Sequence, residues 1–534
     1  MKKLIYIISL TFLMVACTDE VLDINQNPNL ATEAEIDLLL TGAQVGAGFW
    51  TNRNANEAAM ILTRQMYGLA FSQYNIGPDN INNDFNALYS SVLKEFERVI
   101  QQGAEEDNRG AIGIAQVYKA YLFGIMVDLW GDIPYSEALN GEENPFPAFD
   151  DDAQIYDQLL LLLDEAKVNL DTAINRGTAP AAGDVVYGGD YSMYKKVANT
   201  VKLKLLLNLR LTDPGRATSG IEDLIAENDF IDENSENFVF RYGTTISPLN
   251  QNPIYQQEYT GSGNKTFYMD NYFMWKLYNK DDPRLPYYIY RQGTNSELTF
   301  ETTPCSNRTD CTYATLLLEA AENDPQADGL IGRDHGDPSG IPGDNTVRAT
   351  WGVYPIGGLY DNNTRSAAVL GTGANGGGIM PWLTAAMTHF MLAEAALTLA
   401  TGSDDPATLL EAGIDLSMEH VFAEGAALSP NAPAATNASL QDDKDTYITG
   451  IINDYNNASD NGKLNIIIEE KYFAEFGNGF EAYNDLRRTG SPNDLPESLV
   501  PLGPFLNRYP YGRTELTTNP NAPDPAPLVT EKVF

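Results

Sequence analysis

Aromatic side chains in polar surroundings are the residues of this chain with the clearest binding chemistry. The sequence has 5 Trp, 29 Tyr and 21 Phe, and several of them lie outside regular helical stripes. A flat ring can stack on the apolar C–H face of a sugar, while Asn, Asp, Gln or Arg side chains bond to its hydroxyls. Core packing is the alternative for Trp50 and Trp351, and we expect Trp130 and Trp275, on amphipathic helices, to pack in the core. The candidate ligand-binding residues are Trp50, Asn52, Arg53, Phe71, Tyr74, Trp351 and Tyr354.

A glycine run resembles a nucleotide-binding fingerprint without its structural context. Gly371-x-Gly373-x-x-Gly376 has the right spacing, but no strand precedes it inside a βαβ unit. We interpret these glycines as a turn of the chain. No G-x-S-x-G sequence occurs and the three histidines have no evident Ser or Cys partner, so nucleophilic catalysis has little support. We expect His389 to be a packed helix residue.

Acidic residues are too abundant to indicate a catalytic pair. A glycosidase would use two Asp or Glu side chains, and 73 acidic residues place some near one another in any fold. The run at residues 150–152 fits a helix N-terminus, where negative charge is favourable. Calcium stays open at clusters such as residues 361–363, but no EF-hand loop is present. We therefore assign no metal and no cofactor.

The three cysteines fit an exported protein. Cys305 and Cys311 lie six residues apart in a polar stretch, and we expect them to form a disulfide that fixes a local loop and contributes about 2 kcal/mol. Zinc is the alternative. It needs about four ligands, and no histidine lies at a suitable spacing.

The N-terminus has the features of an export signal. Lys2 and Lys3 precede 13 uncharged residues that end before Cys17, too few to cross a hydrocarbon core about 30 Å thick. Residues 14–17, Met-Val-Ala-Cys, resemble a bacterial lipobox, with Met where Leu is usual. We expect a signal peptide at residues 1–16 and a lipid on Cys17. An ordinary signal cleaved elsewhere is the alternative.

Charge excludes some partners. The chain has 34 basic and 73 acidic residues and a net charge of −39. Without Lys2 and Lys3 the net charge is −41. Such a surface repels nucleic acid and anionic lipid headgroups, so a membrane anchor has to be the lipid itself. For the same reason we expect a neutral ligand rather than a sulfated or uronic one.

Hydrophobic periodicity predicts a mainly α-helical protein. Helix pairs of about 35 to 45 residues resemble a tetratricopeptide-like stack. The pairs cover residues 33–230 and 380–490, and a loop-rich insert with short strands covers residues 231–378, where we expect the ligand. We expect one large domain at residues 17–534. Several domains are the alternative, because a domain typically has about 150 residues and the chain has 534. We expect helices at residues 33–49, 57–74, 84–102, 109–130, 151–174, 191–211, 221–228, 381–400, 407–422, 445–455, 464–476 and 480–488.

Several stretches together resemble the SusD/RagB family of nutrient-binding outer-membrane lipoproteins, in its SusD-like branch. Tyr483 stands where the family more often has Trp. The stretches are DINQNPN at residues 23–29, DLWGDIPYSEA at 128–138, FMLAEAAL at 390–397, EKY to RRTGSP at 470–492, and RYP at 508–510 followed by Glu515 and Asn519.

The resemblance implies a role in nutrient uptake. Such proteins are lipid-anchored, mostly helical and lie on the outer membrane, facing the cell surface. They bind oligosaccharides or, in some members, peptides, and deliver them to a TonB-dependent SusC-like transporter. The resemblance implies no catalysis. Binding of peptides rather than glycans, and a glycoside hydrolase with an Asp/Glu pair, are the alternative functions.

Overall fold

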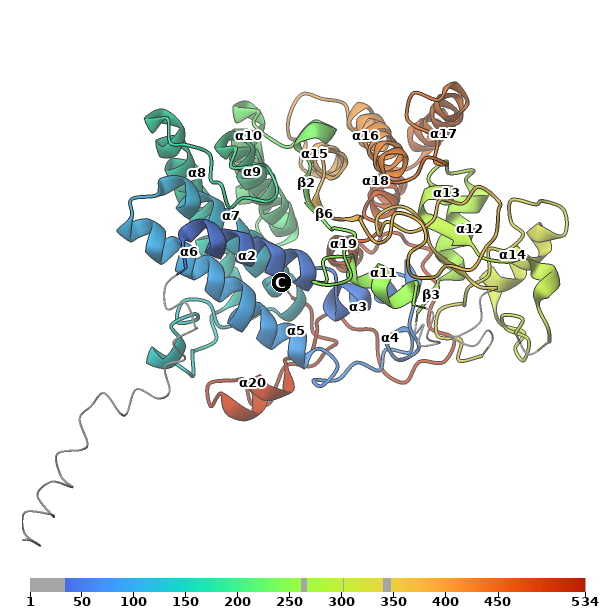
Figure 1. Cartoon of the computed structure of the whole chain (residues 1–534), viewed down its shortest axis with the longest axis horizontal. Helices are drawn as coiled ribbons and strands as arrows, with labels where there is room; N and C mark the ends of the chain where they lie inside the picture. The colour runs from blue at the N-terminus through green and yellow to red at the C-terminus, as the bar shows by residue number, and fades with distance from the viewer. Residues whose placement is uncertain (1–33, 261–266, 301, 340–346, 534) are drawn as a thin grey trace, which may run out of the picture.

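The computed structural model describes residues 34–260, 267–300, 302–339 and 347–533. Helices dominate both halves of this part of the chain (Figure 1), and the strands are short. The N-terminal helices lie at one end of the molecule, the loop-rich segment lies at the other, and the C-terminal helices lie between them. The predicted fold class, mainly α with inserted loops and a few short strands, is confirmed.

Antiparallel helices build the N-terminal part. Helices α7 and α8, α8 and α9, and α9 and α10 pack against one another in sequence order, as expected for stacked helix pairs. The elements are α2 (Ile36–Trp50), α3 (Asn54–Leu62), α4 (Leu69–Ser72), α5 (Asn82–Ala87), the π-helical turn η3 (Leu88–Leu93), α6 (Lys94–Glu105), α7 (Arg109–Trp130), α8 (Asp152–Arg176), α9 (Tyr191–Asn208), the 3-10 turn η5 (Leu209–Leu211) and α10 (Pro214–Glu227).

Local sequence explains where α8 begins and ends. The side chain of Asp151 accepts a hydrogen bond from the backbone N–H of Gln154 at 3.2 Å, which caps the first turn. Gly177 follows the helix with φ of 63°, the left-handed conformation that glycine adopts without strain. The predicted helix start at residues 150–152 is confirmed.

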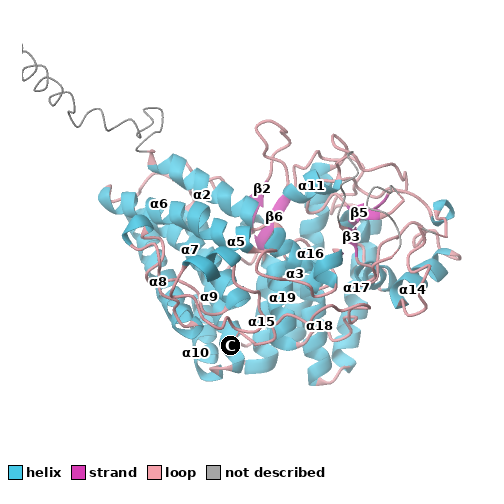
Figure 2. Cartoon of the chain, turned by 90° about the horizontal axis from the view of Figure 1, so that it is seen from below, coloured by secondary structure: helices cyan, strands magenta, loops and turns pink. Residues whose placement is uncertain are grey.

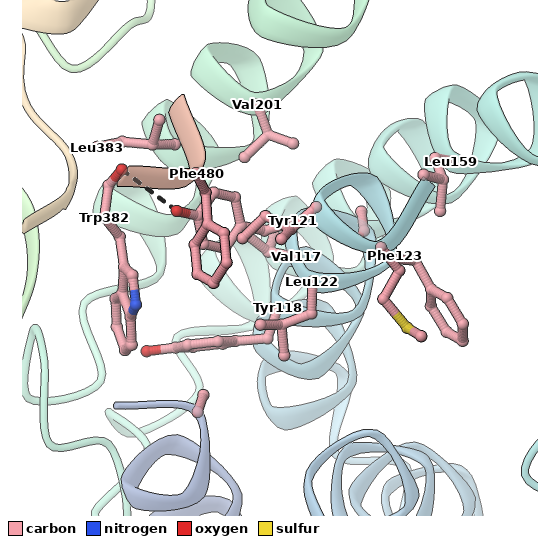
Figure 3. Close-up of a cluster of buried hydrophobic side chains, with 14 of the residues drawn as sticks. Val117, Tyr118, Tyr121, Leu122, Phe123, Leu159, Val201, Trp382, Leu383 and Phe480 are labelled. Carbon is pink, nitrogen blue, oxygen red and sulfur yellow. Dashed lines mark hydrogen bonds between the residues drawn. The ribbon is translucent and has the colours of Figure 1, made fainter. Parts of the chain in front are cut away.

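Helix α7 is the central core helix. It has the length and apolar character of a membrane-spanning helix, but 94% of its most apolar window is buried inside the fold. Figure 3 shows its side chains Val117, Tyr118, Tyr121 and Leu122 among residues from other elements. Trp382 is one of them, and its ring meets Tyr118 edge to face at 5.6 Å. Burial on all sides makes α7 a core element of the globular fold.

Two short strands and five long helices make up most of the C-terminal part. Helices α15 and α16 pack as one pair, and α17 and α18 pack beside them. The elements are β6 (Ile379–Leu383), α15 (Ala385–Leu399), α16 (Pro406–Leu428), α17 (Ala438–Asn457), α18 (Asp460–Ala474), α19 (Gly479–Thr489) and, near the end of the chain, α20 (Arg513–Thr518), while β2 lies earlier in the chain at Phe238–Arg241.

In the described segments, the strands form three two-stranded antiparallel pairs. Strand β2 pairs with β6 beside the helices of both halves, as Figure 2 shows in magenta. The other two pairs lie in the loop-rich end. They join β1 (Met66–Tyr67) to β3 (Tyr268–Met269) and β4 (Ile289–Arg291) to β5 (Ala349–Trp351).

The described residues of the loop-rich insert contain four short α-helices, of which only the one that carries Trp275 was predicted. They are short, and α12 has aromatic residues on more than one face, so it lacks a regular apolar stripe. The side chain of Asp270 caps α12 by accepting from the backbone N–H of Tyr272 at 3.0 Å. These helices are α11 (Pro253–Glu258), α12 (Asn271–Asn279), which carries Trp275, α13 (Leu285–Tyr288) and α14 (Thr312–Ala321).

The single helix predicted at residues 57–74 is wrong. The chain leaves the helix after Leu62, because Arg64 has a positive φ of 62°. Gly68 follows in a crowded place, where an added Cβ would come within 2.7 Å of Ile61. The apolar stripe thus belongs to three separate elements, α3, β1 and α4.

Two stretches behind the family resemblance have structural roles. Trp130 and Gly131 end α7, and Gly131 has φ of 75°. The indole N–H of Trp130 donates to the backbone oxygen of Pro510 at 2.9 Å, and the Arg508 guanidinium donates to the backbone oxygen of Trp130. The RYP stretch therefore closes over the end of α7.

The LAEA and RRTG stretches meet at a buried ion network. The carboxylate of Glu394 is fully buried and bonds to Arg488 and to Arg210, the latter at 2.7 Å. Arg488 also pairs with Asp485 at 2.7 Å, and Asp485 with Lys471 at 2.7 Å. Tyr483 replaces the more usual Trp and donates its hydroxyl to the backbone oxygen of Leu506 at 2.6 Å.

Candidate ligand-binding surface

Three aromatic candidates from the sequence lie in the core. Trp50 is 4% exposed and stacks on Phe480, with ring centroids 5.6 Å apart. Trp351 and Tyr354 are each 1% exposed, and Trp351 stacks on Phe476 at 4.5 Å. Core packing therefore describes these three rings, and the prediction that they form a binding platform is wrong. Trp50 is the last residue of α2 and Trp351 the last of β5, and both rings are covered by residues distant in sequence.

The other candidates are spread over two places. Asn52 is buried, whereas Arg53 beside it is exposed. Phe71 on α4 is half-buried. Tyr74 is buried, and its hydroxyl accepts from the Arg64 guanidinium at 2.8 Å. Arg53 and Phe71 alone keep surface for a ligand, and no contact joins them in the part of the chain that the structure describes.

The cysteine predictions have different outcomes. Cys305 and Cys311 form a disulfide with a Cα–Cα distance of 6.1 Å, in a loop beside α14. Cys17 and the whole signal segment lie outside the described residues.

Trp275, on α12, is the one tryptophan that is not buried. The other four are at most 4% exposed, whereas Trp275 is half-buried and packs one side against the core. Tyr278 lies one turn further along α12, with its ring 5.9 Å from the indole. Residues 275 to 280 read Trp-Lys-Leu-Tyr-Asn-Lys. These polar neighbours are the sequence signal that could have placed the Trp275 ring near solvent, contrary to the prediction that it packs in the core.

Tyr313 of α14 extends this aromatic strip. Its ring meets Tyr272 edge to face at 5.1 Å, and Tyr272 occupies the turn of α12 before Trp275. Because α12 and α14 pack together, the half-buried rings of Trp275, Tyr278 and Tyr313 belong to neighbouring elements. We call these three residues, with Lys276, Asp324 and Asp494, the Trp275 surface.

Polar groups are fixed around the rings. The Tyr278 hydroxyl donates to Asp324 at 2.8 Å, and the Tyr272 hydroxyl donates to Asp494 at 2.7 Å. The Lys276 ammonium donates to Asp494 at 2.8 Å and lies 5.8 Å from the centroid of the Tyr272 ring. The rings can stack on the C–H face of a ligand, and the carboxylates beside them can accept hydrogen bonds from its hydroxyl groups.

The charge states of these groups favour binding over acid catalysis. Burial raises the pKa of Tyr278 to about 12, and its hydrogen bond to Asp324 adds to this effect. Burial and then Asp494 raise the pKa of Tyr313 to about 12. Both hydroxyls stay neutral at physiological pH. Although burial opposes it, the bonds from Lys276 and Tyr272 lower the pKa of Asp494, so this carboxylate accepts hydrogen bonds and does not supply a proton.

The acidic clusters at which a metal could bind take part in other interactions. Asp361, in the cluster where calcium stayed open, gives its carboxylate to the guanidinium of Arg291 at 2.6 Å. Within the described residues, the groups whose ligand atoms lie close enough for a metal are Cys305, Cys311 and Asp337, and Asp132, Asp151 and Asp152. The first contains the disulfide, and the second sits at the start of α8.

The glycines at 371, 373 and 376 form turns before β6. All three have positive φ, between 66° and 87°. An added Cβ on Gly373 would come within 2.2 Å of the backbone oxygen of Gly358. The run therefore needs glycine for its own loop, in agreement with the interpretation as a turn.

Comparison with protein families assigns the fold to a known group. A family model described as SusD-like, starch-binding associating with outer membrane, matches residues 27–500. This chain is a member of that SusD-like family. The family is one of binding proteins of the outer membrane. No curated protein sequence gives a significant match.

Solved structures share the SusD-like fold. An outer-membrane protein from Bacteroides vulgatus has a TM-score of 0.69 at 19% identity, covering 91% of this chain and 94% of that one. A SusD/RagB family protein from Bacteroides thetaiotaomicron has a TM-score of 0.66 at 19% identity, covering 92% and 95%. A chitin-binding SusD homolog from Flavobacterium johnsoniae has a TM-score of 0.62 at 18% identity, covering 91% and 93%. At these identities the likeness concerns the fold alone.

Proposed function

We propose that this SusD-like protein is a surface lipoprotein that binds a neutral oligosaccharide at the Trp275 surface and delivers it to a TonB-dependent SusC-like transporter. The half-buried ring of Trp275 is the observation that supports this site, because the other tryptophans are buried. Family membership supports the class of ligand.

A neutral sugar fits the charges of the molecule. The net charge of −39 gives a potential that repels anionic ligands at long range. At the surface itself, Asp324 and Asp494 offer acceptors for hydroxyl groups, and they would repel a sulfate or a uronate. Two structural relatives are described as chitin-binding, so N-acetylglucosamine oligomers belong in a ligand panel.

The membrane part of the proposal depends on Cys17. A lipid there would hold residues 17–534 at the outer membrane while the acidic body stays above the headgroups. Metabolic labelling with a palmitate analogue checks this, with Cys17→Ser as the control that has to lose the label. A labelled Cys17→Ser protein would contradict lipidation at this residue.

The binding site is tested by calorimetry with purified protein and a panel of neutral, uronic and sulfated oligosaccharides and peptides. We expect a neutral oligosaccharide to bind, and Trp275→Ala to weaken that binding at least about tenfold, as loss of a tryptophan anchor usually does. Phe146→Ala is the matched control, because Phe146 is another exposed ring, 47% accessible, in a different loop. Equal loss in both variants would contradict the site.

The two alternative functions give different results with the same panel. If peptides bind and sugars do not, the ligand is a peptide and the protein is still a nutrient-binding protein. Release of shorter sugars from an oligosaccharide would indicate a hydrolase. The lowered pKa of Asp494 fits an ionised hydrogen-bond acceptor, and a glycosidase would also need a second carboxyl group that keeps its proton.

A further inference from the structure

A small cavity lies where the C-terminal end of α19 meets η5 and the C-terminal tail. Its volume is about 70 Å³, room for a few water molecules or one small polar group. It shares no residue with the Trp275 surface. Three cationic side chains and three amides dominate its lining, which consists of Asn208, Leu211, Thr212, Asn484, Arg487, Arg488, Asn507, Lys532 and Val533.

Arg487 has no carboxylate partner within the described residues. Its guanidinium bonds only to neutral oxygens: those of Tyr483 at 3.3 Å, Asn507 at 2.8 Å and the Asn484 side chain at 3.4 Å. It also lies over the ring of Tyr483, 4.2 Å from the centroid. A guanidinium has five N–H donors, so two remain unused. Most Lys and Arg side chains in the described residues pair with Asp or Glu, as Arg488 does, whereas Arg487 does not.

Arg488 adds an unused donor from a buried side chain. Its two terminal nitrogens bond to Glu394 and Asp485, but its Nε is buried without a hydrogen-bond partner. The side chain is only 7% exposed. An unpaired buried N–H costs free energy, and the Arg488 side chain lines the cavity.

The amides of the cavity are already engaged. The Asn208 amide donates to the Tyr156 hydroxyl at 2.9 Å, and the Asn484 amide donates to the Asn208 oxygen at 3.1 Å. The Asn507 amide donates to the backbone oxygen of Thr530 at 2.8 Å. An amide has two N–H donors, so Asn484 and Asn507 each keep one. The charged donors belong to Arg487, Arg488 and the exposed Lys532, which has no carboxylate partner in the described part either.

We propose that this cavity binds one small anionic group, a carboxylate or a phosphate. Cationic donors around a volume of about 70 Å³ match an oxyanion, and planar guanidinium groups bind such oxygens in pairs. The surrounding negative charge rejects polyanions, whereas a single anion can reach a local cationic site. The proposal does not rest on glycan binding.

The test follows the arginine Nε–H signals by NMR in protein labelled with ¹⁵N-arginine, with sodium acetate, sodium phosphate or sodium chloride added at equal ionic strength. We expect saturable shifts for Arg487 and Arg488 with acetate, phosphate or both, and none with chloride. A response to acetate alone identifies a carboxylate site, and a response to phosphate alone identifies a phosphate site. Absence of saturation, or the same shifts with chloride, would overturn the proposal.

Two variants separate binding from folding. Arg487→Gln is expected to weaken the anion about tenfold or more, the usual loss for a charged hydrogen-bond donor. Lys532→Gln, at an exposed position that tolerates change, is expected to weaken it about twofold to fivefold. Arg513→Gln is the control, because Arg513 pairs with Asp79 on another surface. Unchanged affinity in Lys532→Gln and Arg487→Gln, or an equal loss in Arg513→Gln, would also overturn it.

Discussion

Glu394 illustrates how single residues hold this fold together. Its carboxylate is completely buried between Arg210 and Arg488. Burial alone would raise its pKa, but Arg488 and then Arg210 hold the pKa of Glu394 below its ordinary value. Glu394 and Arg488 belong to family stretches that are distant in sequence and meet at this ion pair, which explains their structural role.

Glu394→Gln is expected to destabilise the protein strongly. The amide would leave Arg210 without a charged partner and Arg488 with Asp485 alone, and breaking a buried ion pair from one side typically costs about 3 to 5 kcal/mol. Urea unfolding followed by circular dichroism measures the loss. Asp79→Asn makes the same chemical change in the exposed pair with Arg513 and should leave the midpoint unchanged. Similar midpoints for both variants would contradict this role of Glu394.

Glu57 makes the stability depend on pH in the opposite way from a paired carboxylate. Burial, then Glu258 and Asp84, raise its pKa from 4.5 to about 8, although Arg53 lowers it. Between these pH values the unfolded chain has lost the proton that the folded chain keeps. The unfolded state binds fewer protons there, so stability falls as pH rises from 4.5 to about 8.

Glu57→Gln should remove this dependence. At pH 4.5 the variant and the native protein should unfold at similar urea concentrations, and at pH 8.5 the variant should be more stable, by a few kcal/mol. Glu424→Gln should instead destabilise the fold at neutral pH, because the hydrogen bond from Arg241 lowers the pKa of Glu424 although burial opposes it. This loss should be constant above about pH 4.5 and should disappear as the pH falls further. A constant difference between native protein and Glu57→Gln across this range would contradict the argument.

At the scale of elements, helix ends could be predicted where the capping residues are local. The region around α8 contains its own start and stop signals in Asp151 and Gly177. The predicted span for α7, residues 109–130, agrees with the structure. In contrast, the end of α3 depends on the backbone of Arg64 and on the crowding of Gly68 against Phe267, a residue about 200 positions away. Local sequence does not contain this contact, so a helix was predicted through residue 74.

Substitution of glycine by alanine should have opposite effects on stability at two positions. An added Cβ would meet nothing within 4 Å at Gly177 or at Gly450. Gly177→Ala should cost about 1 to 2 kcal/mol, because φ is 63° there. Gly450→Ala should stabilise by about 0.5 to 1 kcal/mol, because Gly450 is in the interior of α17. Thermal unfolding measures both, and shifts of the same sign would be inconsistent with this account.

At the scale of the whole molecule, one corner of the chain joins two hydrophobic cores. Phe480 at the start of α19 stacks on Trp50 in the core of the N-terminal helices. Phe476, just before it, stacks on Trp351 in the core of the loop-rich end. Because Phe476 and Phe480 are only four residues apart, the two cores cannot separate unless at least one of these stacking contacts breaks. This continuity supports our proposal of a single large domain.

A single domain should unfold in a single step. We expect one peak in differential scanning calorimetry, with a van't Hoff enthalpy equal to the calorimetric enthalpy. Trp50→Ala should shift the whole peak to lower temperature, because loss of a buried tryptophan from one core would weaken the shared unit. A peak that splits in this variant, or two peaks in the native protein, would instead indicate separate domains.

The sequence by itself determined the mainly helical class, the pairing of long helices and the family, because periodicity, caps and signature stretches are properties of local sequence. It also gave the net charge that disfavours anionic ligands. The tertiary structure decided which rings reach solvent. Trp50 and Trp351 lie in polar sequence but are covered by distant segments, whereas Trp275 lies on a helix whose outer side nothing covers completely.

Charge partners were likewise decided only in three dimensions. Arg487 and Arg488 are neighbours in sequence, yet Arg488 reaches Glu394 and Arg487 reaches no carboxylate in the described chain. Exposure and ion pairing both depend on which segments pack together over long sequence separations. Local sequence does not contain that information, and for this reason the fold could be predicted more completely than the candidate sites.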